Sequence, residues 1–479
     1  MKRILSTIAA AVLAAALIIQ MSGCSVTVRI YGKSIDALSD IDLGYGRVYL
    51  SQVMNALTTD DLQTVNDLGY HAGLEDAETF EELFDTYHEL KESYGEPVSI
   101  YLYEGVQYGD EKAYTGEMEM EKGGTLMLSL LFTSKDELAL AYLYETEKGF
   151  WSHQSMPEGV ITEDVILGEG TEHPLNAQIT YPANASEGCP AIVMVGGDGG
   201  NDMNMKSGST RSYQDLAWGL AEQGIVTIRF DKRTYTYSDE ESAEAAPKEV
   251  FTVDWEYAED TLLALRKLQE KSFVDSEKIY FLGHSQGGVV GSRIQEKALS
   301  EGLQGFAGFV LVNTSPRPWY DVIYDQYINY GLIDRQSDEI YYLVQKMEME
   351  RDYVKEGDYL KTPDEKLTQE FALTRPAAFW RDYLSYDYVD GYRKLAEGGS
   401  RILLMQGGAD YQIVPSTDFE AWKETVSGWN TDTVSFYLAE GLNHLMTPSQ
   451  GIFAGHYKEY EMPGRVPESV IEQIAAFVR

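Results

Sequence analysis

Residues Ile279 to Ile294 read IYFLGHSQGGVVGSRI and place a serine, Ser285, between two glycines. The residues before it form a short apolar run, which is typical of a buried strand, and the small residues after it favour a helix. A G-x-S-x-G sequence between a strand and a helix forms a sharp turn that raises the serine hydroxyl above the sheet. Both glycines are needed, because side chains there would collide with neighbouring backbone. Ser285 is therefore the first candidate for a reactive side chain.

Strand-like and helix-like segments alternate on both sides of this turn. Apolar and β-branched runs predict strands at 191–197, 225–231, 278–283, 306–313, 401–408 and 433–440. Helical patterns predict helices at 212–224, 254–270, 285–299, 416–428 and 467–478. Such alternation predicts an α/β fold, with a mostly parallel sheet that helices cover on both faces.

A polar, aromatic-rich helical insertion interrupts this alternation between residues 313 and 400. Its tryptophans Trp319 and Trp380 have apolar bodies and polar tips, which suit a cap over a partly wet pocket. We therefore expect both side chains to line a substrate pocket. The alternative is a surface elaboration that never contacts substrate.

A different pattern precedes the alternating region. Residues 48–94 carry apolar residues at three- and four-residue spacing, which predicts helices, and residues 98–144 form alternating, β-rich runs. Helices followed by a meander of strands predict a small α+β domain. We place this domain at residues 45–165, after a linker at 24–44, and we assign residues 166–479 to the α/β domain.

Residues 1–23 have the features of a secretory signal. Lys2 and Arg3 precede an apolar run from Ile4 to Ile19, which is short for a membrane span. The sequence MSGC ends at Cys24, and a small residue pair before a cysteine is what a lipoprotein signal peptidase reads. Cleavage there would make Cys24 the acylated first residue and anchor the protein to the outer side of the bacterial cell membrane. The alternative is ordinary cleavage nearby, with Cys24 left as a thiol.

The composition limits the partners of this chain. Its 479 residues are enough for two domains, and a hydrophobic content of 44% is ordinary for a globular protein. The formal charge of −39 opposes binding to nucleic acid and to anionic membrane faces. Cys189 is the only cysteine besides Cys24, so acylation of Cys24 would leave no pair for a disulfide. The sequence has no H-E-x-x-H motif, and we expect neither a metal nor an organic cofactor.

A serine hydroxyl is a weak nucleophile, so Ser285 would need a histidine base and a carboxylate that orients this base. His444 lies in AEGLNHLM, after the last predicted strand, and Asp410 lies in LLMQGGADYQIVP, after the strand before it. Ser285, Asp410 and His444 follow the chain order of hydrolases that contain the G-x-S-x-G turn. His456 is the alternative base. Each residue alone could be a turn, a cap or a solvated loop residue, but their joint occurrence in this order favours a catalytic triad.

Attack on a carbonyl produces an oxyanion that needs hydrogen-bond donors. One donor is expected to be the backbone amide of Gln286, directly after the serine. The second is expected from the glycine-rich loop GGDGGND that begins at Gly196, through the amide of Asp198, with Gly197 as the alternative. Glycine-rich loops also occur in phosphate sites, but no G-K-S or G-K-T follows this one.

The motifs GHSQGG, RFDKR, LVNTSPRP, LLMQGGADYQIVP and GLNHLM together resemble those of bacterial α/β-hydrolases of the esterase and acyl-thioesterase-like kind. Members of that family often carry an N-terminal domain of unknown function with a cone-shaped, nuclear-transport-factor-like fold. The resemblance extends from about residue 45 to residue 479. It implies that Ser285 is the nucleophile, Asp410 the acid and His444 the base.

Two of these segments need separate interpretation. Relatives usually have a G-S-G-P-like loop where this chain has VGGDGGND, and a carboxylate at Asp198 would oppose a developing oxyanion unless its side chain turned away. In RFDKR, the residues Asp231, Lys232 and Arg233 follow a predicted strand end. They could contact substrate, but we interpret them as braces between neighbouring loops.

The sequence thus predicts an enzyme that hydrolyses carboxylic esters, with thioesters as a second substrate class, through an acyl-serine intermediate. A serine peptidase of the oligopeptidase type would share the fold and the triad, but the N-terminal region is too short for the propeller of those enzymes. A non-catalytic binding lipoprotein on a retained hydrolase fold is the alternative outside enzymes. The complete set of triad residues favours catalysis.

Overall fold

The computed structural model describes residues 27–30, 45–61, 63, 78–103, 105–108, 111–133, 138–146, 156–208, 210–237, 251–333, 340–367, 369–451 and 453–479. The chain divides into two compact units. The N-terminal unit comprises Met1–His153, Ser207–Thr210 and Gln450–Gly464. The C-terminal unit comprises Gln154–Lys206, Arg211–Ser449 and Arg465–Arg479. The predicted signal and Cys24 lie outside the described residues.

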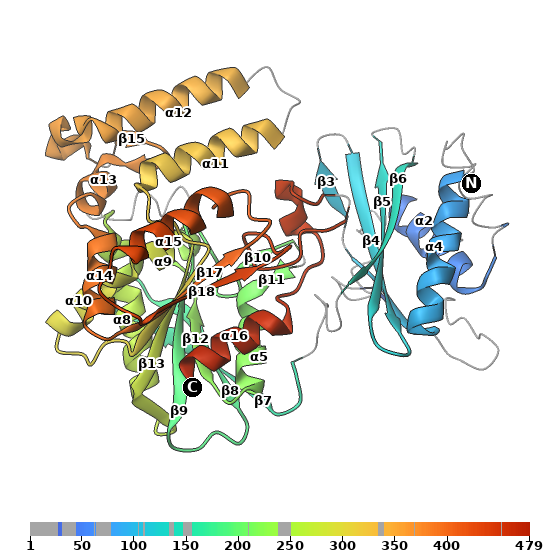
Figure 1. Cartoon of the computed structure of the whole chain (residues 1–479), viewed down its shortest axis with the longest axis horizontal. Helices are drawn as coiled ribbons and strands as arrows, with labels where there is room; N and C mark the ends of the chain where they lie inside the picture. Colours follow the sequence, from blue (N-terminus) through green and yellow to red (C-terminus); the bar gives the residue numbers. More distant parts are fainter. Residues whose placement is uncertain are drawn as a thin grey trace. The chain divides into compact units, whose positions relative to one another are not determined.

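An eight-stranded sheet forms the centre of the C-terminal unit, in the order β18-β17-β14-β13-β9-β12-β8-β7 (Figure 1). The pairs that involve β7 and β8 are antiparallel, and all the other pairs are parallel. The predicted mostly parallel sheet is therefore confirmed. Its strands are β7 (Val160–Leu167), β8 (Leu175–Pro182), β9 (Cys189–Val195), β12 (Val226–Phe230), β13 (Val274–His284), β14 (Gly308–Val312), β17 (Arg401–Gly407) and β18 (Val434–Ala439).

Helices cover both faces of this sheet. Successive side chains of a strand point to opposite faces, so Ile192 lies in one hydrophobic core and Val193 lies in the other. Burial on both faces explains why the parallel strands read as continuous apolar runs. The core around Ile192 receives α5 (Ser212–Glu222) and α16 (Glu468–Val478). The core around Val193 receives α8 (Glu259–Gln269), α10 (Gly291–Ser300), α14 (Tyr388–Glu397) and α15 (Glu420–Ser427).

The insertion between β14 and β17 is mainly helical. Two long helices, α11 (Trp319–Ile333) and α12 (Ile340–Lys355), lie side by side (Figure 1). A short hairpin of β15 (Phe371–Ala372) and β16 (Arg375–Pro376) follows. The helix α13 (Ala377–Tyr383) comes next, and α14 then returns the chain to the large sheet.

The N-terminal unit is an α+β structure. Its sheet has the order β1-β2-β4-β5-β6, and β3 pairs with β4. Two helices contribute to a core with this sheet, in which Leu50 and Met54 pack with Met118 and Leu128. The elements are β1 (Thr27–Ile30), α2 (Tyr45–Thr58), α4 (Glu78–Tyr94), β2 (Pro97–Leu102), β3 (Val106–Tyr108), β4 (Glu111–Met120), β5 (Thr125–Phe132) and β6 (Leu138–Thr146). The expected cone shape of this domain stays a prediction.

The units differ from the expected domains in four places, one of which is that Ser207–Thr210 belongs to the N-terminal unit. β7 pairs with β8 in the large sheet, so a boundary at residue 165 would cut through this strand. β1 pairs with β2, although its residues were expected to belong to a linker at 24–44. The segment Gln450–Gly464 belongs to the N-terminal unit, where Phe453 and Met462 pack with Val106. The partners of β1 and of the segment Gln450–Gly464 lie far away in the chain and leave no local sequence signal, which is why composition did not reveal these two assignments.

Among the described residues, none of the helices combines the length and the apolar character that crossing a membrane requires.

Candidate active site

Ser285 lies at the tip of the sharp turn that its sequence predicts. It connects β13 to α9 (Gln286–Val289), and its backbone angles are φ 53° and ψ −129°, a strained conformation for a residue with a side chain. The glycines around it permit this turn. A Cβ atom on Gly283 would lie 2.5 Å from Gly288 Cα, and one on Gly287 would lie 2.2 Å from the carbonyl oxygen of Gly196. The collisions expected from the sequence are therefore present at both positions.

Asp410 and His444 meet at the same edge of the sheet. Asp410 follows β17 and His444 follows β18, and the two strands are parallel neighbours. His444 Nδ1 lies 2.7 Å from Asp410 Oδ2, and both side chains are buried. An ionised carboxylate only accepts hydrogen bonds, so Nδ1 carries the proton and Nε2 of the neutral ring is left as the basic nitrogen.

The Asp410 carboxylate is held by several donors besides His444. Oδ1 accepts the backbone amides of Gln412, at 2.8 Å, and Ile413, at 3.1 Å. Oδ2 also accepts Gln406 Nε2 at 3.3 Å. These donors fix the orientation of the carboxylate. Gln406 was not predicted from the sequence, because a glutamine in a buried strand has no pattern of its own.

Two buried side chains hold the His444 loop against the serine turn. The carbonyl oxygen of His444 lies 2.7 Å from His284 Nε2 and accepts Asn313 Nδ2 at 2.6 Å. The His284 and His444 rings are also in contact, with centroids 4.5 Å apart. Asn313, at φ 52°, accepts the Gly407 amide through Oδ1 as well. His444 is thereby fixed beside the residue that precedes Ser285. No hydrogen bond joins Ser285 Oγ to His444 within the described residues, and such bonds often tighten only when substrate binds.

The expected oxyanion residues lie next to the serine. A Cβ atom on Gly197 would lie 3.0 Å from Ser285 Cβ. The Gly197 carbonyl oxygen accepts Lys232 Nζ at 2.6 Å, and a second donor group, Tyr257 Oη, lies 3.2 Å from it. The C=O and N–H of a trans peptide point in opposite directions, so the Asp198 amide faces away from these two donors. In the described part of the chain, neither this amide nor that of Gln286 has a protein acceptor.

The Asp198 carboxylate is paired with protein groups and is not a free negative charge at the oxyanion position. It accepts a hydrogen bond from Arg375 and, at 2.7 Å, the backbone amide of Gly199. The opposition between a carboxylate and a developing negative charge, expected from the sequence, is therefore reduced by an ion pair. Arg375 comes from the insertion and was not among the predicted residues, because 177 positions separate it from Asp198.

Asp231, Lys232 and Arg233 of RFDKR are turned toward protein partners. Asp231 Oδ1 accepts the Met203 amide at 2.8 Å, and Arg233 pairs with Asp260 at 2.8 Å. Lys232 Nζ donates to Gly197 O and pairs with Glu256 at 2.9 Å. The interpretation of this segment as a brace agrees with these contacts. One of the loops that it braces is the predicted oxyanion loop.

The two tryptophans of the insertion do not line a pocket in this structure. Trp319 and Trp380 are both 0% exposed and belong to the core around Val193. The indole N–H of Trp380 donates to the carbonyl oxygen of Ala372 at 2.8 Å. The expectation that both face substrate is therefore wrong. An aromatic side chain in a helical insertion suits a pocket wall and a helix core equally, and the sequence alone does not distinguish them.

Truncating these side chains should accordingly destabilise the fold. Trp380→Ala should lower the free energy of unfolding by about 3–5 kcal/mol, because it empties a fully buried site. Urea unfolding followed by tryptophan fluorescence and circular dichroism measures this change. Tyr235, which is 47% exposed, provides the control, and Tyr235→Ala should stay within about 0.5 kcal/mol of the parent protein. Equal stability of the Trp380→Ala variant and the parent protein would contradict the core assignment.

His456, the alternative base, caps a short 3₁₀ helix instead. Its Nδ1 accepts the Lys458 amide at 3.1 Å, and the residue belongs to the N-terminal unit. His444 is therefore the histidine that the structure brings to Asp410.

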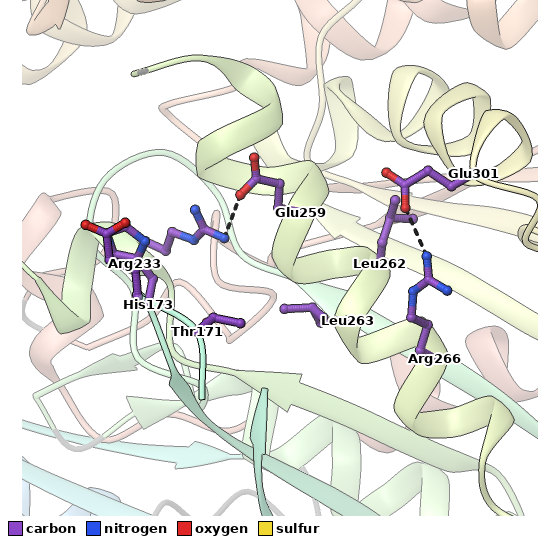
Figure 2. A pocket seen from close by; sticks show the side chains of 9 residues that line it. Thr171, His173, Arg233, Glu259, Leu262, Leu263, Arg266 and Glu301 are labelled. Atoms are coloured by element: carbon purple, nitrogen blue, oxygen red, sulfur yellow. Dashed lines mark hydrogen bonds and ion pairs between the residues drawn. The ribbon is translucent and has the colours of Figure 1, made fainter. Parts of the chain in front are cut away.

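An open depression of about 360 Å³ lies elsewhere in the C-terminal unit (Figure 2). Its lining residues are Thr171, Glu172, His173, Arg233, Glu259, Leu262, Leu263, Arg266 and Glu301, none of which belongs to the site around Ser285. Its arginines are already paired, since Arg233 contacts Glu259 at 2.8 Å and Arg266 contacts Glu301 at 3.0 Å (Figure 2). Neither of these two arginines is free to bind an anionic ligand.

His284 should make the protein sensitive to acid. Burial, with a smaller contribution from repulsion by His444, lowers the pKa of His284 to about 3. An unfolded histidine has a pKa of about 6.5, so between these two values the unfolded chain binds a proton that the folded protein excludes. The free energy of unfolding should therefore fall as the pH is lowered through this window, by up to about 1.4 kcal/mol per pH unit from this group.

Urea unfolding at about pH 7.5 and about pH 5 measures this dependence. His284→Phe should be less stable at the higher pH but should lose less stability on acidification than the parent protein. All other titrating groups are common to both proteins, so their contributions to the pH dependence of stability cancel in the comparison. The same loss of stability in both proteins would show that His284 does not have a lowered pKa.

Residues 192–451 match the model of the alpha/beta hydrolase family. The chain is similar to esterase EstD from Thermotoga maritima, with 27% identity over 398 residues that cover 83% of this chain and 86% of EstD.

Similar solved structures include brefeldin A esterase, described as a bacterial homologue of human hormone-sensitive lipase, and fungal esterases from Rhizomucor miehei. The first has 16% identity and a TM-score of 0.39, covering 68% of this chain and 78% of its own. The second has 17% identity and a TM-score of 0.40, covering 68% and 85%. Because the family model spans more than half of its residues, this chain belongs to the alpha/beta hydrolase family.

Proposed function

We propose that this protein is a serine esterase that hydrolyses small carboxylic esters through an acyl-serine intermediate. The observation that carries the proposal is the 2.7 Å hydrogen bond between His444 Nδ1 and Asp410 Oδ2, held beside the strained turn of Ser285. A buried imidazole with its tautomer fixed by a carboxylate is what activates a serine hydroxyl. The name of the relative EstD supports an ester as the substrate class.

The reaction follows from these positions. Ser285 Oγ attacks the ester carbonyl carbon while its proton passes to His444 Nε2, and the carbonyl oxygen becomes an oxyanion. The amides of Gln286 and Asp198 donate to this oxygen, and the Asp410 carboxylate stabilises the imidazolium. The carbon–oxygen bond to the alcohol then breaks, and His444 returns the proton to the leaving oxygen. A water molecule, deprotonated by His444, releases the acid from Ser285 in the second half of the reaction.

Hydrolysis of p-nitrophenyl butyrate tests the proposal. The purified protein should release p-nitrophenol with saturable kinetics, and high enzyme concentrations should show a burst if deacylation is slow. Parallel assays with a butyryl thioester and with a peptide p-nitroanilide separate the three substrate classes. Hydrolysis of the anilide at a higher kcat/KM than the ester would assign the protein to the peptidases. The absence of hydrolysis of any of the three substrates would contradict the proposal.

We also propose that the mature protein is a lipoprotein anchored through Cys24 to the outer side of the bacterial membrane. The supporting observation is the MSGC sequence after the apolar run from Ile4 to Ile19. Expressed in a bacterium, the protein should partition into detergent and incorporate labelled palmitate, and Cys24→Ser should abolish the label. A soluble protein whose first residue is not Cys24 would contradict this location.

A further inference from the structure

The hairpin of β15 and β16 has an unusual turn. Leu373 and Thr374, its two central residues, both have positive φ, at 51° and 64°. Hairpin turns of this kind normally carry asparagine or glycine, and a positive φ is a marked outlier for a β-branched threonine. Leu373 is nevertheless fully buried, and its amide donates to Glu350 Oε2 of α12 at 2.7 Å. The surrounding insertion therefore imposes the conformation of this turn.

Arg375 follows the turn directly and extends into the site. Its residue is 4% exposed, and its guanidinium forms a forked pair with Glu256, in which Nη1 donates to Oε2 at 2.8 Å and Nη2 to Oε1 at 3.1 Å. Nη2 also donates to Asp198 Oδ1 and, at 3.1 Å, to Gln286 Oε1. One side chain of the insertion thus contacts both residues whose amides are the expected oxyanion donors.

Glu256 and Tyr257 contribute to this arrangement from another segment of the chain. They lie in a single π-helical turn, Asp254–Ala258, a feature that is frequent at functional sites. Glu256 pairs with Lys232, and Tyr257 Oη donates to Gln286 Oε1 at 2.6 Å. The side chain of Gln286 is therefore held by two donors, Tyr257 and Arg375.

The four charges around this loop sum to zero, and three of them are buried, whereas the Asp198 side chain is 31% exposed. Arg375 and Lys232 are the cations, and Asp198 and Glu256 are the anions. Burial acts to lower the pKa of Arg375, but Asp198 and Glu256 outweigh it and raise this pKa, so the guanidinium stays charged. Without Arg375 the loop would carry one net negative charge next to the place where the oxyanion forms. An uncompensated charge in a buried site acts strongly on a neighbouring charge.

We propose that Arg375 is a positioning residue for the oxyanion hole: it fixes the segments of Asp198 and Gln286 and neutralises the Asp198 carboxylate. The inference rests on the esterase function proposed above. In this inference the strained hairpin of the insertion helps to stabilise the transition state, and it does not contact the acyl group directly.

Arg375→Met tests this role, with Arg381→Met as the matched control from the same insertion. Arg381 pairs with the exposed Asp364 and donates to the carbonyl oxygen of Thr362. Arg375→Met should lower kcat for p-nitrophenyl butyrate on the order of a hundredfold and leave KM within about threefold, because an oxyanion interaction is made only in the transition state. The control should keep the kcat of the parent protein within about twofold.

A second substitution separates the effect of the lost positive charge from the effect of the lost structural support. In the Arg375→Met background, Asp198→Asn removes the unpaired carboxylate and keeps the backbone amide. This double variant should regain at least about tenfold of the lost kcat, because the two residues are coupled. An alkyl trifluoromethyl ketone, whose serine adduct carries an oxyanion, should lose affinity for Arg375→Met by a factor similar to the loss in kcat.

Arg375→Lys extends the test in case the methionine variant does not fold. Lysine keeps the buried positive charge but cannot form the two parallel hydrogen bonds of the guanidinium. This variant should lose about tenfold in kcat at unchanged KM.

A folded Arg375→Met or Arg375→Lys variant with the kcat of the parent protein would overturn the inference. A rise in KM with kcat unchanged, or a double variant as slow as Arg375→Met, would also overturn it. If Ser285→Ala is inactive while the Arg375 variants are fully active, only this inference fails. If Ser285→Ala is active, the proposed function fails.

Discussion

Ser285→Ala should lower kcat for p-nitrophenyl butyrate on the order of a thousandfold or more, because the variant has no oxygen that can form the acyl-enzyme. The residual rate should still exceed that of the reaction in water, since the oxyanion donors and the binding surface remain. Alanine at this position removes one buried oxygen and leaves the turn glycines in place, so the fold should persist. Circular dichroism and urea unfolding of the purified variant check this point.

His444→Ala should cause a loss of the same order, and the double variant should lose little more than either single variant. The reason is that nucleophile and base act as one unit, so removal of the second adds little after the first is gone. Ser300, an exposed serine at the end of α10, gives the control, and Ser300→Ala should keep the activity of the parent protein. A Ser285→Ala variant that hydrolyses the ester at nearly the parent rate would show that another residue is the nucleophile.

Asp410→Asn should lower kcat by about 1,000- to 10,000-fold with little change in KM. An asparagine amide can donate to Nδ1, which leaves the proton on Nε2 and makes the ring unable to accept the serine proton. Asp418→Asn is the matched control, because Asp418 is also a buried carboxylate of the same segment and accepts Ser315 Oγ at 2.6 Å. This control should be less stable but should stay within a few-fold of the parent kcat. A similar loss of kcat in both variants would attribute the Asp410 effect to the fold.

Local sequence patterns predicted the parts of the site that depend on one strand and the turn after it. Ser285, Asp410 and His444 each follow a strand whose apolar run is evident, and parallel strands end at the same edge of a sheet. The glycines at 283 and 287 predicted the turn geometry, because their place in the turn leaves no room for a Cβ atom. These features need no knowledge of distant residues.

Features that depend on distant pairing were not predicted. Arg375, Glu256 and Asp198 meet from three separate segments, and nothing near any of them in the sequence indicates the other two. The edge strand β7 was divided between the two expected domains, because an antiparallel strand at the end of a sheet looks the same in either unit. The contact of His284 with the His444 carbonyl was not predicted either, because it depends on a loop 160 residues away.

The account depends most directly on an activated Ser285, and covalent labelling measures this property. A fluorophosphonate reacts with a serine only when a base removes its proton and an oxyanion hole receives the phosphonyl oxygen. After incubation of the protein with this probe, peptide mass spectrometry should find one adduct, on Ser285 in the peptide that contains GHSQGG. Ser285→Ala should remain unlabelled. An unlabelled parent protein, or an adduct on a different residue, would contradict the assignment of Ser285 as the nucleophile.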